Sequence, residues 1–168
     1  VFSYVASFGA FTRTSYTTPQ SIKNALGHTA YVLEGIQELT QIRNEHIKMI
    51  VDGEVVEDDF LFGAICNSTS VGGVLTLDPD VVDLQDNKLE ILLVRAPRNL
   101  AELHECILAL QDQTYNCAML TFRSATHIRI FADPEMPWTL DGEREEGHSE
   151  VEVVPEHLAY RLMKRVQP

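Results

Sequence analysis

The chain has 168 residues, of which 45% are hydrophobic and 23% are charged, and its formal net charge is −12. This composition supports a real hydrophobic core and excludes a disordered chain, while the acidic surplus argues against nucleic acid and anionic head groups as partners. No apolar run approaches the roughly 18–20 residues that span a bilayer, and the first residues do not resemble a signal peptide.

The chain starts at Val1 within a strand-like pattern, so we expect this residue not to be the natural N-terminus. The three cysteines, Cys66, Cys106 and Cys117, form no CxxC pair. We expect them to be reduced, and reduced thiols are typical of a cytoplasmic protein.

Hydrophobic periodicity divides the first part of the chain into strands and one helix. Thr18 can cap a helix and Pro19 suits its first turn, and apolar residues then recur at helical spacing. Asp52-Gly53, between alternating segments, is the signal of a type I′ hairpin turn. The predicted elements are a strand over residues 1–11, a helix over 18–41, a hairpin of 47–51 with 54–56, and a strand over 59–67.

The second part of the chain contains another helix between strands. Asn99 is a good N-cap, and Glu102 occupies the capping-box position three residues later. Leu100, Leu103 and Leu110 then lie on one predicted face, together with Ile107. The predicted elements are a strand over 88–94, a helix over 99–115, a hairpin of 117–123 with 127–131, a strand over 150–154 and a helix over 157–166.

Sequential strands favour an antiparallel arrangement over a doubly wound α/β fold. We therefore predict a mostly β (α+β) fold, an antiparallel β-sandwich with two appended helices, formed by residues 1–168 as a single domain. Residues 133–146, with two prolines and an acidic stretch, are predicted to be the most irregular region.

The triplet Asp-Gly-Glu occurs twice, at Asp52-Gly53-Glu54 and at Asp141-Gly142-Glu143. A hairpin turn is the default interpretation, and the first copy fits it because strands flank both sides. The second copy follows Trp138 and precedes a polar stretch that a turn alone does not need. A carboxylate presented there could serve as a general base.

A second constellation lies at residues 83–88, where Asp83, Asp86 and Asn87 precede Lys88. One interpretation is a solvated β-turn before the next strand. The other is a loop for a hard cation, because such turns direct carbonyl and carboxylate oxygens toward one point, which suits Mg²⁺ or Ca²⁺.

At these residues the sequence resembles the bacterial diacylglycerol kinase and lipid kinase family, which includes the sphingosine kinases. Short motifs in the family's order carry the resemblance and span almost the whole chain. They are Tyr4–Thr12 with Thr18-Pro19-Gln20 and Leu26-Gly27-His28 to Tyr31; Asn67-Ser68 with Gly72-Gly73 and Pro79; Asp86 with Leu89-Glu90-Ile91; and Leu140–Glu143 with Val151-Glu152-Val153 and Pro155.

The resemblance implies the C-terminal domain of a two-domain lipid kinase. A separate N-terminal domain would bind ATP with a Gly-Gly-Asp-Gly-Thr loop, which this chain lacks. The family expectation makes Glu143 the proton acceptor, supported by Asp141. It also implies a structural Mg²⁺ held by the Asp86 side chain and by main-chain oxygens at Asp83 and Lys88.

Two features of this sequence bear on the implied cation site. Relatives often have Gly where this chain has Asn87, but Asn tolerates a left-handed φ. The ammonium group of Lys88 would have to swing away from a bound cation.

The implied substrate is the hydroxyl group of diacylglycerol or a related lipid, reached by peripheral membrane contact of a cytoplasmic enzyme. The isolated chain is expected to be inactive, and a homodimer is left open. Two alternatives also stay open at this point: a non-catalytic β-sandwich binding module, and a kinase of the same lineage that acts on a soluble alcohol.

Overall fold

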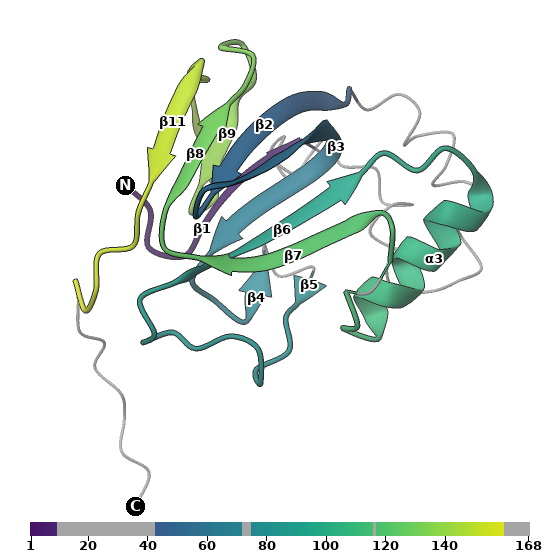
Figure 1. The fold of residues 1–168 in the computed structure, drawn as a ribbon, viewed down its shortest axis with the longest axis horizontal. Helices are drawn as coiled ribbons and strands as arrows, with labels where there is room; N and C mark the ends of the chain where they lie inside the picture. Colours follow the sequence, from purple (N-terminus) through teal and green to yellow (C-terminus); the bar gives the residue numbers. More distant parts are fainter. Residues whose placement is uncertain (10–42, 72–74, 116, 160–168) are drawn as a thin grey trace, which may run out of the picture.

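The computed structural model describes residues 1–9, 43–71, 75–115 and 117–159. Antiparallel strands dominate these residues, with one helix beside them (Figure 1). The elements are β1 (Val5–Gly9), β2 (Glu45–Val51), β3 (Glu54–Cys66), β4 (Ser70–Val71), β5 (Leu75–Thr76), β6 (Leu89–Arg95), α3 (Leu100–Gln111), β7 (Leu120–Ala125), β8 (Ile128–Phe131), β9 (Trp138–Leu140), β10 (Glu143–Glu145) and β11 (Glu150–Val153).

The main sheet has nine strands in the order β10-β9-β1-β3-β2-β8-β11, and β6 pairs with both β3 and β7. The short strands β4 and β5 pair with each other. Every strand pairing described is antiparallel, and the long sheet curls on itself. The prediction of a mostly β, antiparallel fold is confirmed.

Strand β3 connects the two parts of the curled sheet. On one edge, Glu54–Phe60 pairs with β2 and Phe62–Cys66 pairs with β1, while β6 lies along the other edge, with a register shift between Phe60 and Phe62. The sequence predicts two strands here, 54–56 and 59–67, because the acidic residues Glu57 and Asp58 interrupt the apolar pattern. Burial explains the continuity: the first half alternates near the surface, whereas the last seven residues are buried on both faces.

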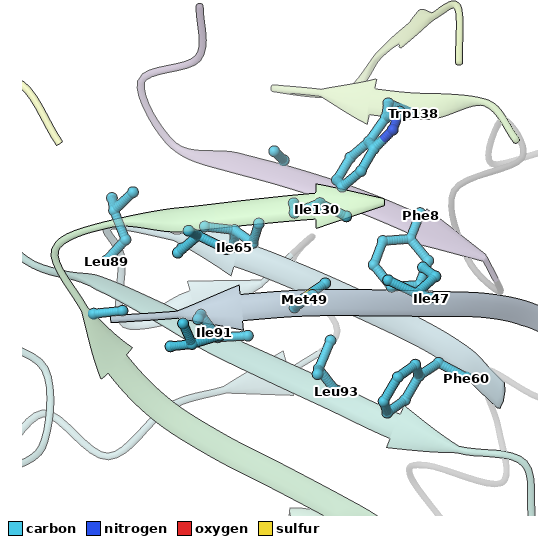
Figure 2. Close-up of a cluster of buried hydrophobic side chains, with 14 of the residues drawn as sticks. Phe8, Ile47, Met49, Phe60, Ile65, Leu89, Ile91, Leu93, Ile130 and Trp138 are labelled. Atoms are coloured by element: carbon cyan, nitrogen blue, oxygen red, sulfur yellow. The ribbon is translucent and has the colours of Figure 1, made fainter. Parts of the chain in front are cut away.

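Two hydrophobic cores lie on opposite faces of β3 and β6. The first core is enclosed by the curl of the sheet, as Figure 2 shows. The second core lies beneath α3, which contributes Cys106 and Ala109, and beneath the segment between β3 and β6. The first core contains Ala6, Phe8, Ile47, Met49, Val51, Phe60, Ile65, Leu89, Ile91, Leu93, Ala125, Ile128, Ile130, Met136 and Trp138. The second contains Val5, Leu61, Phe62, Ala64, Cys66, Val71, Leu77, Val82, Leu92, Val94, Cys106, Ala109 and Leu120.

The cap of helix α3 is as predicted. The side chain of Asn99 accepts a hydrogen bond from the backbone N–H of Glu102, at 3.0 Å. The carboxylate of Glu102 accepts from the backbone N–H of Arg98 rather than from that of Asn99. The helix ends at Gln111, four residues before the predicted end at residue 115.

The predicted hairpin between residues 117–123 and 127–131 is wrong. Strand β7 pairs with β6, whereas β8 pairs with β2 and β11. The connection at Thr126-His127 carries the chain from one part of the curled sheet to the other. Alternation identified both strands, but their partners depend on which core each one faces.

The predicted helix over residues 18–41 lies outside the described residues, as does most of the predicted helix over 157–166; residues 157 and 158 form a turn. All three cysteines are free, with Cys66 and Cys106 buried and Cys117 half-buried. Within the described residues, no helix is both long and apolar enough to cross a membrane.

Candidate functional site

The motif segments meet at one end of the main sheet. Strand β1 begins beside the end of β3, because Val5 pairs with Cys66, and β6 begins on the other side of β3, because Glu90 also pairs with Cys66. Strand β9 ends beside β1, since Leu140 pairs with Ala6. We call this region, formed by the start of β1, the end of β3, the start of β6 and the end of β9, the motif end (Figure 1).

The second Asp-Gly-Glu triplet forms a tight hairpin at the motif end. Asp141 and Gly142 occupy the two turn positions between β9 and β10, with φ of 52° and 94°, as a type I′ turn requires. Glu143 follows as the first residue of β10 and pairs with Leu140. The prediction that this region is irregular is wrong: the three charged residues of β10 form a strand although they carry no hydrophobic alternation.

The carboxylate of Asp141 is fully engaged by the start of β1. Its Oδ2 accepts hydrogen bonds from the backbone N–H and the hydroxyl of Ser3, at 2.7 and 2.9 Å. Its Oδ1 accepts from the backbone N–H groups of Tyr4 and Val5, at 2.8 and 2.9 Å. The backbone N–H of Asp141 in turn donates to the carbonyl of Val5, at 2.8 Å.

These contacts determine the protonation state of Asp141. Partial burial favours the neutral acid, but the hydrogen bonds to the charged form outweigh it and lower the pKa of Asp141 below its ordinary value. A carboxylate with occupied oxygens and a lowered pKa is a poor proton acceptor. Its geometry suits the supporting role better than that of the base.

The first triplet has the same local structure. Asp52 and Gly53 form the β2–β3 turn with φ of 47° and 92°. The Asp52 carboxylate accepts from the backbone N–H and hydroxyl of Thr126 and from the backbone N–H of His127, and its own N–H donates to the carbonyl of His127 at 2.9 Å. Both triplets are therefore hairpin turns whose Asp binds the backbone of another segment, so the predicted difference in turn structure is wrong.

The two triplets differ in their glutamates. Glu54 forms an ion pair with Arg123 of β7. Glu143 is exposed, and its side chain has no hydrogen bond or ion pair with any residue in the described ranges. Among the described residues, the Glu54 carboxylate is therefore engaged by a cation and the Glu143 carboxylate is not.

The turn at residues 83–88 precedes β6 at the same motif end. The backbone N–H of Asp86 donates to the Asp83 carbonyl, and Asn87 adopts a left-handed φ of 61°, as the sequence analysis expected of it. The Asp86 carboxylate accepts from the backbone N–H of Lys88, at 2.9 Å, and its Oδ2 lies 3.6 Å from the Lys88 ammonium.

The carboxylate and carbonyl oxygens of this turn are ligands that suit a hard cation. However, the Lys88 ammonium group lies beside Oδ2 of Asp86, the oxygen that such a cation would use. Among the described residues, no three His, Cys, Asp or Glu side chains form a metal-binding group. A cation here would thus depend on one carboxylate and on main-chain oxygens. Strands β3 and β1 separate this turn from the Asp141 turn, which puts them on the order of 15 Å apart.

Sequence reasoning did not single out Glu90 as a site residue. Its side chain is 1% exposed on β6, and neither carboxylate oxygen has a hydrogen bond of ordinary geometry. Burial is the main cause that raises the pKa of Glu90 to about 7, and the nearby Asp86 carboxylate is the second. The Ser124 side chain opposes this shift by favouring the charged form, although it makes no hydrogen bond of ordinary geometry to either oxygen. The available signal was one acidic residue within a strand whose other residues before Arg95 are all apolar.

Comparisons with known proteins agree with this architecture. A crystal structure described as that of a diacylglycerol kinase from Bacillus anthracis str. Sterne aligns with a TM-score of 0.54 at 20% identity, covering 92% of this chain and 50% of that one. A second structure from the same organism aligns with a TM-score of 0.63 at 19% identity, covering 93% and 50%. The chain thus has the fold of about half of these two proteins.

Sequence comparison gives the family. Residues 5–161 match the family described as the YegS C-terminal NAD kinase beta sandwich-like domain, and the chain belongs to that family. The diacylglycerol kinase of Bacillus subtilis (strain 168) is 27% identical over 143 residues, which are 84% of this chain and 46% of that protein. The diacylglycerol kinase of Staphylococcus carnosus (strain TM300) is 29% identical over the same shares of the two chains. The chain therefore spans about half the length of these relatives.

Proposed function

We propose that this chain forms the lipid side of an ATP-dependent kinase that phosphorylates the hydroxyl of diacylglycerol or a related lipid, with Glu143 as general base. The observation that carries the proposal is the exposed Glu143 carboxylate, which forms no ion pair with the described residues and lies next to a hairpin turn that Asp141 holds against β1. The names of the related kinases support the reaction and the substrate class.

The chemistry follows from the weak nucleophilicity of an alcohol near neutral pH. The lipid oxygen attacks the γ-phosphorus of ATP, the bond from that phosphorus to the β–γ bridging oxygen breaks, and ADP leaves. Glu143 accepts the hydroxyl proton as the new bond forms. ATP would be bound mainly by a nucleotide-binding domain outside this chain. Because the substrate is a lipid, we expect the cytoplasmic enzyme to contact the membrane surface peripherally.

A substrate comparison tests this function in the full-length enzyme. With labelled ATP, we expect phosphate transfer to diacylglycerol in mixed micelles and none to glycerol at the same hydroxyl concentration. Transfer to glycerol alone would favour a kinase for soluble alcohols. Lipid binding without transfer to either acceptor would favour a binding module.

The isolated chain should not phosphorylate diacylglycerol, because it has no phosphate-binding loop to position ATP. The measurement is labelled phosphate transfer by residues 1–168 at enzyme concentrations where the full-length kinase gives a strong signal. Circular dichroism of the same sample verifies that the chain is folded. Turnover by this folded chain alone would contradict the two-domain organisation.

We also propose that the residue 83–88 turn binds a structural Mg²⁺ through the Asp86 carboxylate and the main-chain oxygens of Asp83 and Lys88. Such an ion would fix the turn ahead of β6. Mg²⁺ at 100 times its Kd should raise the Tm of the chain by about 5–10 °C, and Asp86→Ala should abolish this increase.

Asp78→Ala is the matched control for that experiment. Asp78 also accepts a hydrogen bond from a backbone N–H two residues later, that of Asp80, at 2.9 Å, in the same connection between β5 and β6. The control should lower the Tm slightly and keep the Mg²⁺ response. An unchanged Mg²⁺ response in Asp86→Ala would show that the ion does not bind at this turn. A small loss of stability with no Mg²⁺ response in either protein would favour a simple β-turn.

A further inference from the structure

We propose that Asp141 is a positioning residue for Glu143: its carboxylate ties the β9–β10 turn to the start of β1 and thereby fixes where the Glu143 carboxylate lies. This inference rests on the proposed function of Glu143. It concerns a residue that contacts neither lipid nor nucleotide in the proposed reaction, and that would act only through the base two positions later.

Apart from the Asp141 contacts, the β9–β10 hairpin is held by few interactions among the described residues. Within the described part of the chain, β10 is the edge strand of the sheet and pairs with β9 alone. Strand β9 pairs with β1 through three residues, from Trp138 to Leu140. The ring of Trp138 packs edge-on against Phe8 at a centroid distance of 5.3 Å, at the end of β9 away from the turn.

At the turn itself, the hydrogen bonds of Asp141 hold the hairpin against the start of β1. The four hydrogen bonds to its carboxylate come from Ser3, Tyr4 and Val5, and each is between 2.7 and 2.9 Å long. Hydrogen bonds to an ionised acceptor are about twice as strong as neutral ones. Because only Gly142 separates Asp141 from Glu143, any shift of this contact moves the base directly.

A second feature makes the position of the turn sensitive to this carboxylate. Both residues of the turn have positive φ, which is unfavourable for Asp141 as a non-glycine residue. The hydrogen bonds stabilise that conformation. Without them the short, three-residue β10 could shift its pairing with β9, and a one-residue shift would turn Glu143 to the other face of the sheet.

The chain contains a matched control in Asp52. This residue has the same turn conformation, the same kind of backbone bond and the same use of its carboxylate, but it ties the β2–β3 turn to Thr126 and His127. Its neighbour Glu54 is paired with Arg123 and takes no part in the proposed reaction. A purely structural role for both aspartates predicts similar effects of the two substitutions.

The test is a double-mutant cycle in the full-length kinase, with kcat, the KM for ATP and Tm measured for each variant. Asp141→Asn keeps the shape but places an NH₂ group against N–H donors. We expect kcat to fall about 10- to 100-fold, as misplacement of a catalytic group does, with little change in the KM for ATP. Asp52→Asn should lower Tm about as much as Asp141→Asn does. It should leave kcat within about threefold of wild type.

The decisive comparison is made in the Glu143→Gln background. If Asp141 acts through Glu143, then Asp141→Asn should reduce kcat less than twofold further once the base is gone. Ser3→Ala, which removes only one of the four donors, is a milder variant should Asp141→Asn fold poorly; it should lower kcat a few-fold and show the same dependence on Glu143.

Different failures have different meanings. Two results would overturn the positioning role while leaving Glu143 as the base. One is an equal kcat for Asp141→Asn and Asp52→Asn. The other is a double variant whose fold loss in kcat equals the product of the losses of Asp141→Asn and Glu143→Gln. A Glu143→Gln enzyme with normal kcat would overturn the proposed base, and with it the role of Asp141.

Discussion

If Glu143 is the general base of the proposed full-length kinase, replacing it by Gln is expected to lower kcat by about 10²–10⁴, the range over which such a base assists proton transfer. The amide has the same shape as the carboxylate but cannot accept the hydroxyl proton. Because Glu143 is exposed and its side chain forms no hydrogen bond or ion pair with another described residue, its replacement should leave Tm within about 1 °C. Lipid KM should change little, so the loss should lie almost entirely in kcat.

Glu54→Gln is the internal control for that measurement. It changes the same residue in the same triplet and the same type of turn, but at a position where the carboxylate is paired with Arg123. Its kcat should stay within about threefold of wild type. Equal kcat losses from both substitutions would mean that neither glutamate is the base, and a normal kcat for Glu143→Gln would assign proton transfer to another residue.

Glu90→Gln is expected to stabilise the chain at pH 8 much more than at pH 4.5. In the folded protein, burial raises the pKa of Glu90 from its ordinary 4.5 to about 7. Below pH 4.5 the carboxyl is protonated in both states. As the pH rises toward 7, the unfolded chain ionises first, so the wild type loses stability relative to a residue that stays neutral. The full difference, reached above pH 7, is about 3 kcal/mol.

The measurement is urea unfolding of wild type and Glu90→Gln at pH 4.5, 6 and 8, with EDTA present because a cation near Asp86 would change the charge around Glu90. The difference in the free energy of unfolding between the two proteins should grow by about 3 kcal/mol across this range. A difference that stays constant with pH would mean that Glu90 finds a partner for its charge in the folded state.

Elements with strong local sequence signals were predicted correctly. Strand pairings that depend on tertiary contacts were not. The Asp52-Gly53 turn and the Asn99 cap were predictable because each depends on residues that are adjacent in the chain. The partners of β7 and β8 were not, because alternation identifies a strand but not the core that it faces. Strand β10 was missed because its three residues are all charged.

Some features of the candidate site could likewise be predicted from the sequence, and others could not. The resemblance to lipid kinases pointed to Glu143 and Asp86 through their motifs. Three of the four donors to the Asp141 carboxylate are backbone N–H groups and one is a hydroxyl, and all lie 136 to 138 positions earlier in the chain. Every residue type except proline has a backbone N–H, so such partners cannot be recognised from the sequence. The hairpin contact could therefore be found only from the structure.

The course of β3 has a consequence for how the molecule unfolds. Phe60 and Ile65 of this strand belong to the first core, while Phe62 and Ala64 belong to the second, so both cores contain side chains from one continuous segment of backbone. Detaching β3 would open both cores at once. It would also separate β1, against which the Asp141 turn is held, from β6, which follows the Asp86 turn. Unfolding that detaches β3 would therefore displace the hairpin with Glu143 and the turn with Asp86 together.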